Sequence, residues 1–362
     1  MPLKTSFQPY TLEFKFDAGT SRGVLREKET WFIKVWDEAN PKIFGLGEAG
    51  PLKKLSIDDR EDMHQQLAII LRTLEGREHP KSEEEIYQIA KELAGRDFPS
   101  VRFALETALL DLLNGGERII FKNAFTSSGL KIPINGLIWM GHTDSMLLQI
   151  TDKVAAGFDC IKMKIGSMDF EKECDILDYV RRKYYQKELL IRVDANGAFK
   201  VEEALSQLHT LSKYKIHSIE QPIKAGQPEA MRKLCEQSPI GIALDEELIG
   251  VYNKSEKEAL LREIRPHYII LKPTLAGGIR SCIEWVEIAA AMNIGWWLTS
   301  ALESNIGLNA ICQLAVHLKA ISYQGLGTGQ LYYNNIPSPL SVESGHIGYN
   351  SHVQWDLKDL TL

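Results

Sequence analysis

The chain has 362 residues, of which 44% are hydrophobic and 25% charged, and its formal net charge is −6. This length exceeds one ordinary domain, so we expect either one large barrel or two domains. Charges of both signs are mixed along the chain, which gives no basic face for nucleic acid or anionic lipid. No stretch reaches the roughly 20 apolar residues of a membrane span, and the first residues lack a signal peptide's apolar run. We therefore expect a cytoplasmic protein with neither nucleic acid nor a membrane as partner.

The five cysteines are widely spaced and include no C-x-x-C pair. An odd number argues against a complete disulfide framework, and the spacing does not fit a zinc site. We expect all five to be buried as small apolar residues in a reducing compartment.

The first third of the chain changes from strand-like to helical patterning. Residues 7–37 contain two alternating runs, YTLEFKF and TWFIKVW, which predict two antiparallel strands. Helical periodicity follows over 59–74, 82–96 and 100–116, and Ser82 and Glu85 have the spacing of a capping box. Residues 1–125 therefore read as an α+β unit.

From Ile132 onward, short apolar runs recur, each followed by a turn and a helix-like stretch. Their centres lie near residues 136, 162, 192, 218, 243, 270, 297 and 323. Eight strand–helix units of this size predict an α/β fold, a (β/α)8 TIM-type barrel over residues 126–335. Residues 336–362 follow the eighth run and carry strand-like pieces, so we expect them to return to the first unit. The capping domain would then be formed from both chain ends.

Charged residues stand where five consecutive runs end. They are Lys164, with Lys162 two residues before it, then Asp194, Glu220, Asp245 and Lys272. Alternate side chains of a strand share a face, so the first two lysines enter one interior. Their burial is costly unless anions lie nearby or one lysine is kept neutral as a base. The reacting groups of such barrels sit at the C-terminal strand ends, so we expect these side chains to converge there.

Three carboxylates without histidine or cysteine are a donor set that suits Mg²⁺, with Mn²⁺ as a substitute. A lysine on either side of this metal would flank a small carboxylate substrate. Such a site can stabilise the enediolate formed when the carbon next to a carboxylate loses its proton. A lysine whose pKa is lowered by the cation and by a neighbour such as Lys162 can act as the base. Any one of these acids alone would more often be a structural salt bridge or turn; their common placement indicates a site.

The motifs K-x-K, D-A-N-G, E-Q-P, D-E-E and L-K-P occur in this order over nearly the whole chain. The set resembles the muconate-lactonising branch of the enolase superfamily. That resemblance implies a barrel with an α+β cap and a lysine base assisted by Mg²⁺. By the same resemblance, Lys164 and Lys272 are the acid/base pair and Asp194, Glu220 and Asp245 the metal ligands. Lys162, Asn196 and Glu246, which belong to the same motifs, are expected to support them.

Four segments outside these motifs look like those of the o-succinylbenzoate synthases, the dehydratases of menaquinone biosynthesis. They are SRGVL (21–25), GLGEAGPLKKLS (45–56), TSALESNIGLNA (299–310) and GLGTGQLYYNN (325–335). The resemblance implies the syn-dehydration of 2-succinyl-6-hydroxy-2,4-cyclohexadiene-1-carboxylate to 2-succinylbenzoate. The substrate contacts expected from these segments are Ser21, Arg22, Ser300, Glu303, Asn305, Gly325 and Gly327. The loop at 21–23 is expected to close over the substrate.

Three alternatives stay open at this point. Dipeptide epimerases place acidic residues after the eighth strand to hold the substrate's ammonium group, and there is no Asp or Glu between Ser304 and Val342. Residues 325–329 either present backbone N–H groups to an anion or form a tight turn. N-succinylamino acid racemase uses similar pockets. An inactive scaffold or binding barrel is disfavoured because every expected catalytic position is filled, and the sequence leaves the oligomeric state open.

Overall fold

The structure, a computed structural model, describes residues 2–20, 23–166 and 168–362. Strands β1 (Leu3–Thr20), β2 (Gly23–Asp37) and β3 (Phe44–Ala49) form an antiparallel sheet in that order. Helices α1 (Met63–Leu74), α2 (Glu83–Ala94) and α3 (Pro99–Leu113) follow, and α3 is buried along most of its length. Ser82 caps α2 by accepting a 3.3 Å hydrogen bond from the Glu85 N–H. The predicted order of strands and then helices is confirmed.

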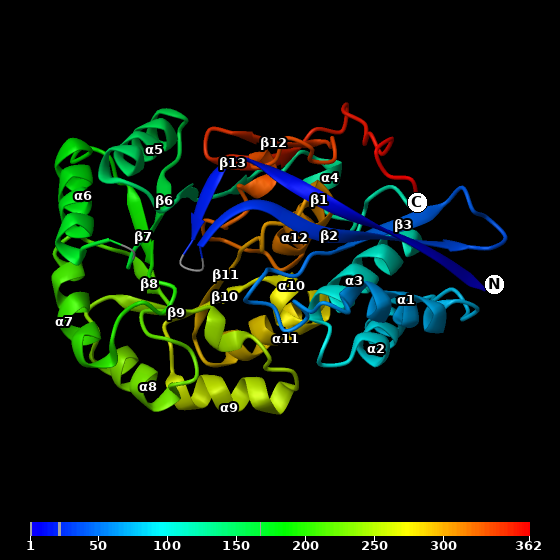
Figure 1. Ribbon diagram of the computed structural model, residues 1–362, viewed down its shortest axis with the longest axis horizontal. Coiled ribbons are helices and arrows are strands. Elements are labelled where there is room, and N and C mark those ends of the chain that lie inside the picture. The colour runs from blue at the N-terminus through cyan, green and yellow to red at the C-terminus, as the bar shows by residue number, and fades with distance from the viewer. Residues whose placement is uncertain (1, 21–22, 167) are drawn as a thin grey trace.

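The second part of the chain forms a curled, seven-stranded parallel sheet. In chain order its strands are β5 (Gly136–Ile138), β6 (Cys160–Lys164), β7 (Leu190–Asp194), β8 (Ser218–Glu220), β9 (Gly241–Leu244), β10 (Tyr268–Leu271) and β11 (Gly295–Leu298). The helices between and after them are α5 (Thr143–Ala155), α6 (Phe170–Lys183), α7 (Val201–Ser212), α8 (Pro228–Gln237), α9 (Lys254–Ile264), α10 (Pro273–Ala276), α11 (Gly278–Ala291) and α12 (Asn305–His317). Figure 1 shows α5 to α9 as an arc outside the strands. The prediction of successive strand–helix units is confirmed for seven strands.

The eighth predicted strand, residues 320–327, differs from the expectation. It makes only single bridges, from Gln324 to Ile134 and from Gly325 to Thr299, so the structure shows a curled sheet rather than a closed eight-stranded barrel. A side chain replaces part of the backbone ladder, because Oε1 of Gln324 accepts the Leu298 N–H at 2.8 Å. A Cβ atom on Gly325 would lie 2.5 Å from the Thr299 hydroxyl. The close approach at this seam therefore needs glycine.

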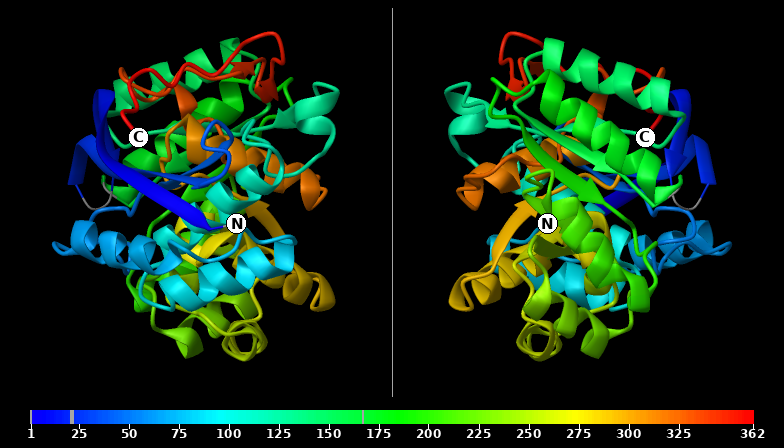
Figure 2. Two further views of the ribbon diagram at one scale, coloured as in Figure 1. Left: turned by 90° about the vertical axis from the view of Figure 1, so that its right-hand side faces the viewer. Right: turned by 90° about the vertical axis from the view of Figure 1, so that its left-hand side faces the viewer.

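The C-terminal residues return to both parts of the molecule. Strand β12 (Leu340–Glu343) pairs with β13 (His346–Tyr349), and β13 pairs with β4 (Ile132–Pro133), which follows the short helix α4 (Ala124–Ser127). The last residues pack on the N-terminal sheet, where Lys34 Nζ donates to the Leu362 carbonyl oxygen at 3.0 Å. In Figure 2 this segment, in red, runs along the top of both views. All five cysteines are free and buried, as predicted. Within the described ranges no helix is long and apolar enough to cross a membrane.

Two buried carboxylates of the N-terminal part bind helix N-termini of the strand–helix part. Glu48 on β3 accepts the N–H of Ser304 at 2.9 Å and that of Gly307 at 3.0 Å, at the start of α12. Glu106 on α3 accepts the N–H groups of Ile279 and Arg280 at the start of α11. The unpaired N–H groups and dipole of a helix N-terminus favour such anions. These contacts fix the cap above the ends of β10 and β11.

Replacing Glu48 by glutamine is expected to lower the stability of the whole chain. The neutral amide loses the charge that faces the α12 N-terminus and turns a donor toward the N–H groups. We expect a loss of about 3 kcal/mol, or a melting temperature lower by about 5 °C in thermal unfolding. Glu343→Gln on β12, which removes an exposed 2.9 Å ion pair with Lys131 and lies at no helix end, is the control and should change the melting temperature by about 1 °C at most. Equal melting temperatures for the two variants would contradict this account of the cap.

Candidate active site

Charged side chains meet at the C-terminal ends of β6 to β10. The strand register places Lys164 opposite Asp194, and Asp194 opposite Glu220, so these three side chains lie level on neighbouring strands. Asp245 and Lys272 come directly after β9 and β10. All five side chains are buried or nearly so, and the prediction that strand ends bring them together is confirmed.

The lysine ammonium groups lie between the carboxylates. Lys162 Nζ is 2.9 Å from Asp194 Oδ2 and 2.6 Å from Glu220 Oε2. Lys164 Nζ is 3.1 Å from Asp194 Oδ2. Lys272 Nζ contacts Asp245 Oδ2 and lies 3.8 Å from Glu220 Oε1. Opposite charges this close reduce the cost of burying one another. The carboxylates are therefore the nearby anions that the burial of Lys162 and Lys164 required.

These contacts shift the ionisation of the cluster. Burial lowers the pKa of Lys162, but the charges of Asp194 and Glu220 outweigh it, and the pKa ends above its ordinary value. Burial also lowers the pKa of Lys272, but the charges of Asp245 and Glu220 outweigh this effect and raise the pKa above its ordinary value. The carboxyl of Asp194 has a lowered pKa despite its burial, since three lysines surround it. Burial and the neighbouring Asp194 charge raise the pKa of Glu220.

Asn196 and Glu246 form a bridge above this cluster. Asn196 Oδ1 accepts a hydrogen bond from Lys164 Nζ at 2.8 Å, and its Nδ2 donates to Glu246 Oε1 at 3.0 Å. The Asn196 N–H also donates to Asp194 Oδ1 at 3.0 Å. Its φ of +44° lies in the left-handed region, which costs free energy that functional sites often store. Asn196 therefore orients both Lys164 and Asp194.

Gln221 is a second orienting residue, and the sequence analysis assigned it no role. Its Oε1 accepts the N–H of Asp245 at 3.2 Å and that of Glu247 at 3.3 Å, while Nε2 donates to Glu247 Oε2 at 3.1 Å. The side chain is fully buried. The sequence contained a signal for this role in the glutamine of the E-Q-P motif. A buried side-chain amide next to an acidic residue needs several hydrogen-bond partners.

The donor chemistry of the three acids fits a hard divalent cation. Asp194, Glu220 and Asp245 offer only carboxylate oxygens, from three consecutive strands. Within the described residues, Glu220 Oε1 is buried and has no hydrogen-bond partner. The described part of the chain contains no group of three acidic, histidine or cysteine side chains that is already arranged to bind a metal ion. Lys162 and Lys272 each contact two of the three carboxylates, so ammonium groups stand where a shared cation would lie.

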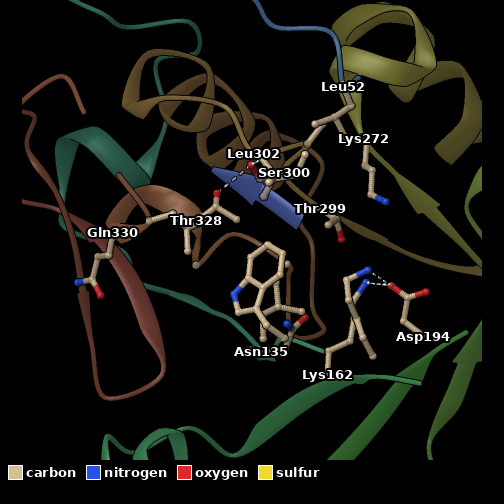
Figure 3. A pocket seen from close by; sticks show the side chains of 18 of the residues that line it. Leu52, Asn135, Lys162, Asp194, Lys272, Thr299, Ser300, Leu302, Thr328 and Gln330 are labelled. Carbon is tan, nitrogen blue, oxygen red and sulfur yellow. Dashed lines mark hydrogen bonds and ion pairs between the residues drawn. The ribbon is translucent and has the colours of Figure 1, made fainter. Parts of the chain in front are cut away.

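A cavity of about 490 Å³ opens beside this cluster. Lys162, Lys164, Asp194, Asn196 and Lys272 form its charged wall. Facing them are hydroxyl, amide and glycine residues from the first, seventh and eighth units: Asn135, Thr299, Ser300, Gly325, Gly327, Thr328 and Gln330. Apolar residues that include Leu52, Leu137, Trp139 and Leu302 complete the walls. Figure 3 shows Asp194, Lys162 and Lys272 on one side and Ser300, Thr328 and Gln330 on the other.

The predicted substrate contacts divide into three groups. Ser300, Gly325 and Gly327 line the cavity. Glu303 and Asn305 are not among its described lining residues. Glu303 is buried and accepts a hydrogen bond from the Ser300 hydroxyl. Asn305 Nδ2 donates a hydrogen bond to the Ile336 carbonyl oxygen at 2.7 Å. Ser21 and Arg22 lie outside the described residues. Substrate contact by these last four stays a prediction.

Asn135 and Trp139 are cavity residues that the sequence analysis missed. Both belong to the first barrel strand region, where residues 135, 137 and 139 share one face and all line the cavity. Asn135 is 5% exposed, and within the described chain its Oδ1 has no hydrogen-bond partner. A buried amide oxygen without a partner is costly unless a ligand or water satisfies it. An asparagine before a strand usually marks a turn, so its position alone does not indicate a cavity residue.

Comparison with known proteins identifies the family. The family described as "Enolase C-terminal domain-like" matches residues 145–351. An o-succinylbenzoate synthase of Desulfotalea psychrophila is 43% identical, over 96% of this chain and 99% of that protein. The chain belongs to the o-succinylbenzoate synthase family of the enolase superfamily. The crystal structure of MenC from Desulfotalea psychrophila LSv54 superposes with a TM-score of 0.85 at 40% identity, and covers 96% of this chain and 100% of that one.

Relatives outside the o-succinylbenzoate synthase family are more distant. An L-amino acid-D/L-Glu epimerase of Sulfurimonas denitrificans is 26% identical, over 85% of this chain and 88% of that protein. The crystal structure of a dipeptide epimerase from Enterococcus faecalis V583, complexed with Mg and the dipeptide L-Leu-L-Tyr, has a TM-score of 0.85 at 18% identity. It covers 98% of this chain and 100% of that one, and at this identity it shows the shared fold alone.

Proposed function

We propose that Lys164 and Lys272 carry out the reaction of the o-succinylbenzoate synthase family from opposite sides of one bound carboxylate. The reaction is the syn-dehydration of 2-succinyl-6-hydroxy-2,4-cyclohexadiene-1-carboxylate to 2-succinylbenzoate. The observation that carries the proposal is their placement: both line one cavity, and the carboxylates of Asp194 and Asp245 hold them at separate strand ends.

Lys164 would serve as the base and then as the acid. As a neutral amine, its Nζ takes the proton from the carbon next to the substrate carboxylate. The resulting ammonium returns that proton to the leaving hydroxyl, which departs as water from the same face. Asn196 Oδ1, 2.8 Å from Lys164 Nζ, holds the amine in place for both steps. One residue can serve both steps because the proton and the hydroxyl leave from one face.

Lys272 would remain an ammonium throughout. Its Nζ contacts Asp245 Oδ2 and lies 3.8 Å from Glu220 Oε1, a position suited to a positive charge. A fixed positive charge stabilises the negative charge that develops on the enediolate without transferring a proton. This role needs charge and position, whereas a base needs an amine that can lose its proton.

Asp194, Glu220 and Asp245 would hold Mg²⁺, for which Mn²⁺ can substitute. The bound cation would neutralise charge on the substrate carboxylate and so favour loss of the neighbouring proton. Support comes from the all-carboxylate donor set and from Glu220 Oε1, which is buried and has no hydrogen-bond partner within the described chain. Gln221 and Asn196 would keep Asp245 and Asp194 aimed at the site.

We also propose that residues 320–327 act as the eighth strand and close a (β/α)8 barrel. The support is that backbone groups of Gln324 and Gly325 bond to both neighbours, to Pro133 and Asn135 on one side and to Leu298 and Ser300 on the other. The proposed division is a capping domain over 1–125, a barrel domain over 126–335, and a returning segment over 336–362. With no membrane partner and a small-molecule substrate, we place the protein in the cytoplasm, in menaquinone biosynthesis.

The assay that tests this function follows aromatisation of the cyclohexadiene substrate by absorbance, with Mg²⁺ present. We expect 2-succinylbenzoate to form. N-succinylamino acids and dipeptides, followed by optical rotation, test the racemase and epimerase alternatives on the same preparation. Racemisation without any aromatic product would overturn the proposal, and inactivity toward all three substrates would favour the non-catalytic barrel.

Replacing Lys272 by arginine separates the two roles of the lysines. Arginine keeps the positive charge but does not act as a base at neutral pH. We expect dehydration to persist with kcat lower by roughly 10- to 100-fold, because the guanidinium is larger and displaced. Any racemase activity toward N-succinylamino acids should disappear, since racemisation needs one base on each face. Full racemase activity in Lys272→Arg would refute this division of labour.

A further inference from the structure

The cavity wall carries more lysines than carboxylates although the protein as a whole is negative. Among its described lining residues are six lysines, Lys53, Lys54, Lys153, Lys162, Lys164 and Lys272. Asp194 is the one acidic residue that the same described lining contains, while the chain carries a formal charge of −6. A cleft lined by one sign of charge concentrates ligands of the other sign. The cavity is therefore built for an anion.

The lysines of the central cluster are already paired with carboxylates. Lys162, Lys164 and Lys272 contact Asp194, Glu220 and Asp245. Lys53 and Lys54 differ: both are exposed, and the described parts of the chain place no carboxylate within ion-pair distance of either ammonium group. Their charge is available to a ligand.

The loop that carries these two lysines is fixed on the strand ends. Leu52 packs in an apolar cluster with Leu275 and Ala301, which follow Lys272 and Ser300 in the chain. The Leu52 N–H donates to Ser56 Oγ at 2.7 Å. Figure 3 shows Leu52 and Lys272 on the same side of the cavity. The loop therefore holds Lys53 and Lys54 at a set place on the rim.

The backbone at Lys54 forms a tight turn in this loop. Its φ is +62°, in the left-handed region, where a non-glycine residue is strained. Its N–H donates to Asp59 Oδ2 at 2.6 Å, which holds the turn. Lys215 and Lys319, which do not line the cavity, have similar φ values, so this conformation fixes the turn and does not by itself mark a ligand site.

We propose that Lys53 and Lys54 form a cationic rim that captures the second carboxylate of a dianionic substrate, while the first would go to the Mg²⁺ that Asp194, Glu220 and Asp245 are proposed to hold. This inference rests on the proposed function, whose substrate carries a ring carboxylate and a succinyl carboxylate. The rim selects by charge. A dipeptide presents an ammonium group instead of a second anion, and the rim lysines repel it.

The test removes both charges and measures binding of two probes in the presence of Mg²⁺. Lys53→Gln/Lys54→Gln is compared with wild type for 2-succinylbenzoate, a dianion, and benzoate, a monoanion, by calorimetry at 20 and 300 mM salt. At low salt we expect the variant to bind 2-succinylbenzoate roughly 5- to 20-fold more weakly, with a flatter salt dependence. Benzoate affinity should change about twofold at most, since its carboxylate would go to the Mg²⁺.

Lys42→Gln/Lys122→Gln is the matched control. These two lysines are exposed, have no carboxylate of the described chain within ion-pair distance, and do not line the cavity. Their loss changes net charge equally and should leave both affinities unchanged. Single variants at 53 and 54 show whether one lysine carries the effect.

Unchanged 2-succinylbenzoate binding in the rim variant would overturn the proposal. So would an equal loss for both probes, or an equal loss in the control, because each would indicate a general field and no second-carboxylate contact. These outcomes are independent of the proposed function, which fails if wild type forms no 2-succinylbenzoate from the cyclohexadiene substrate. With that function intact, kcat of the rim variant should match wild type while KM rises.

Discussion

Replacing Lys164 by alanine is expected to abolish the formation of 2-succinylbenzoate, with kcat/KM lower by about 10⁴-fold or more. The loss is large because a single amine would both take the α-proton and return it to the leaving hydroxyl. Proton exchange at the α-carbon of N-succinylamino acids should fall with it. Stopped-flow absorbance for dehydration and NMR in deuterated water for exchange measure the two losses on one preparation.

Lys122→Ala, at an exposed position away from the cavity, controls for removal of a lysine, and its rates should equal those of wild type. The melting temperature of Lys164→Ala must be measured as well, because the change also removes the 3.1 Å contact with Asp194. A folded Lys164→Ala variant that dehydrates the substrate within tenfold of wild type would show that another residue is the base.

Changing Asp194, Glu220 or Asp245 to its amide is expected to weaken Mg²⁺ binding by more than roughly 100-fold and to stop turnover, because a neutral oxygen replaces a charged ligand. Calorimetric titration with Mg²⁺ in the absence of substrate measures the first effect apart from the second. Glu236→Gln, a change at an exposed residue of α8 that does not line the cavity, is the control for an acidic residue outside the donor set. Wild-type Mg²⁺ affinity together with wild-type turnover in any two of the three variants would exclude this donor set.

The sequence was sufficient to predict which residues meet, because a parallel sheet brings all C-terminal strand ends to one edge. The positions of Lys164, Asp194, Glu220, Asp245 and Lys272 follow from the spacing of the strand–helix units and from side-chain alternation. The sequence alone did not predict which lysine contacts which carboxylate. That pairing depends on strand register and twist, which place Lys162 against both Asp194 and Glu220.

The eighth strand and the orienting residues were harder to predict for physical reasons. The last apolar run looks like a strand in the sequence, but Gln324 and Gly325 make single bridges, and the Gln324 side chain accepts one N–H of the neighbouring strand. Asn135 and Gln221 act through amide groups, whose partners are fixed by tertiary packing and leave no periodic signal. The two lysines of the rim look like an ordinary exposed turn until the loop is seen against the cavity.

A crystal structure of the protein with Mg²⁺ and 2-succinylbenzoate tests the central claim most directly, because the claim concerns where two lysines stand relative to one carboxylate. We predict a single Mg²⁺ bound by Asp194, Glu220 and Asp245 and by the ring carboxylate of the product, with Lys164 Nζ and Lys272 Nζ on opposite faces of the ring. A metal bound elsewhere, or both lysines on one face of the ring, would contradict the account.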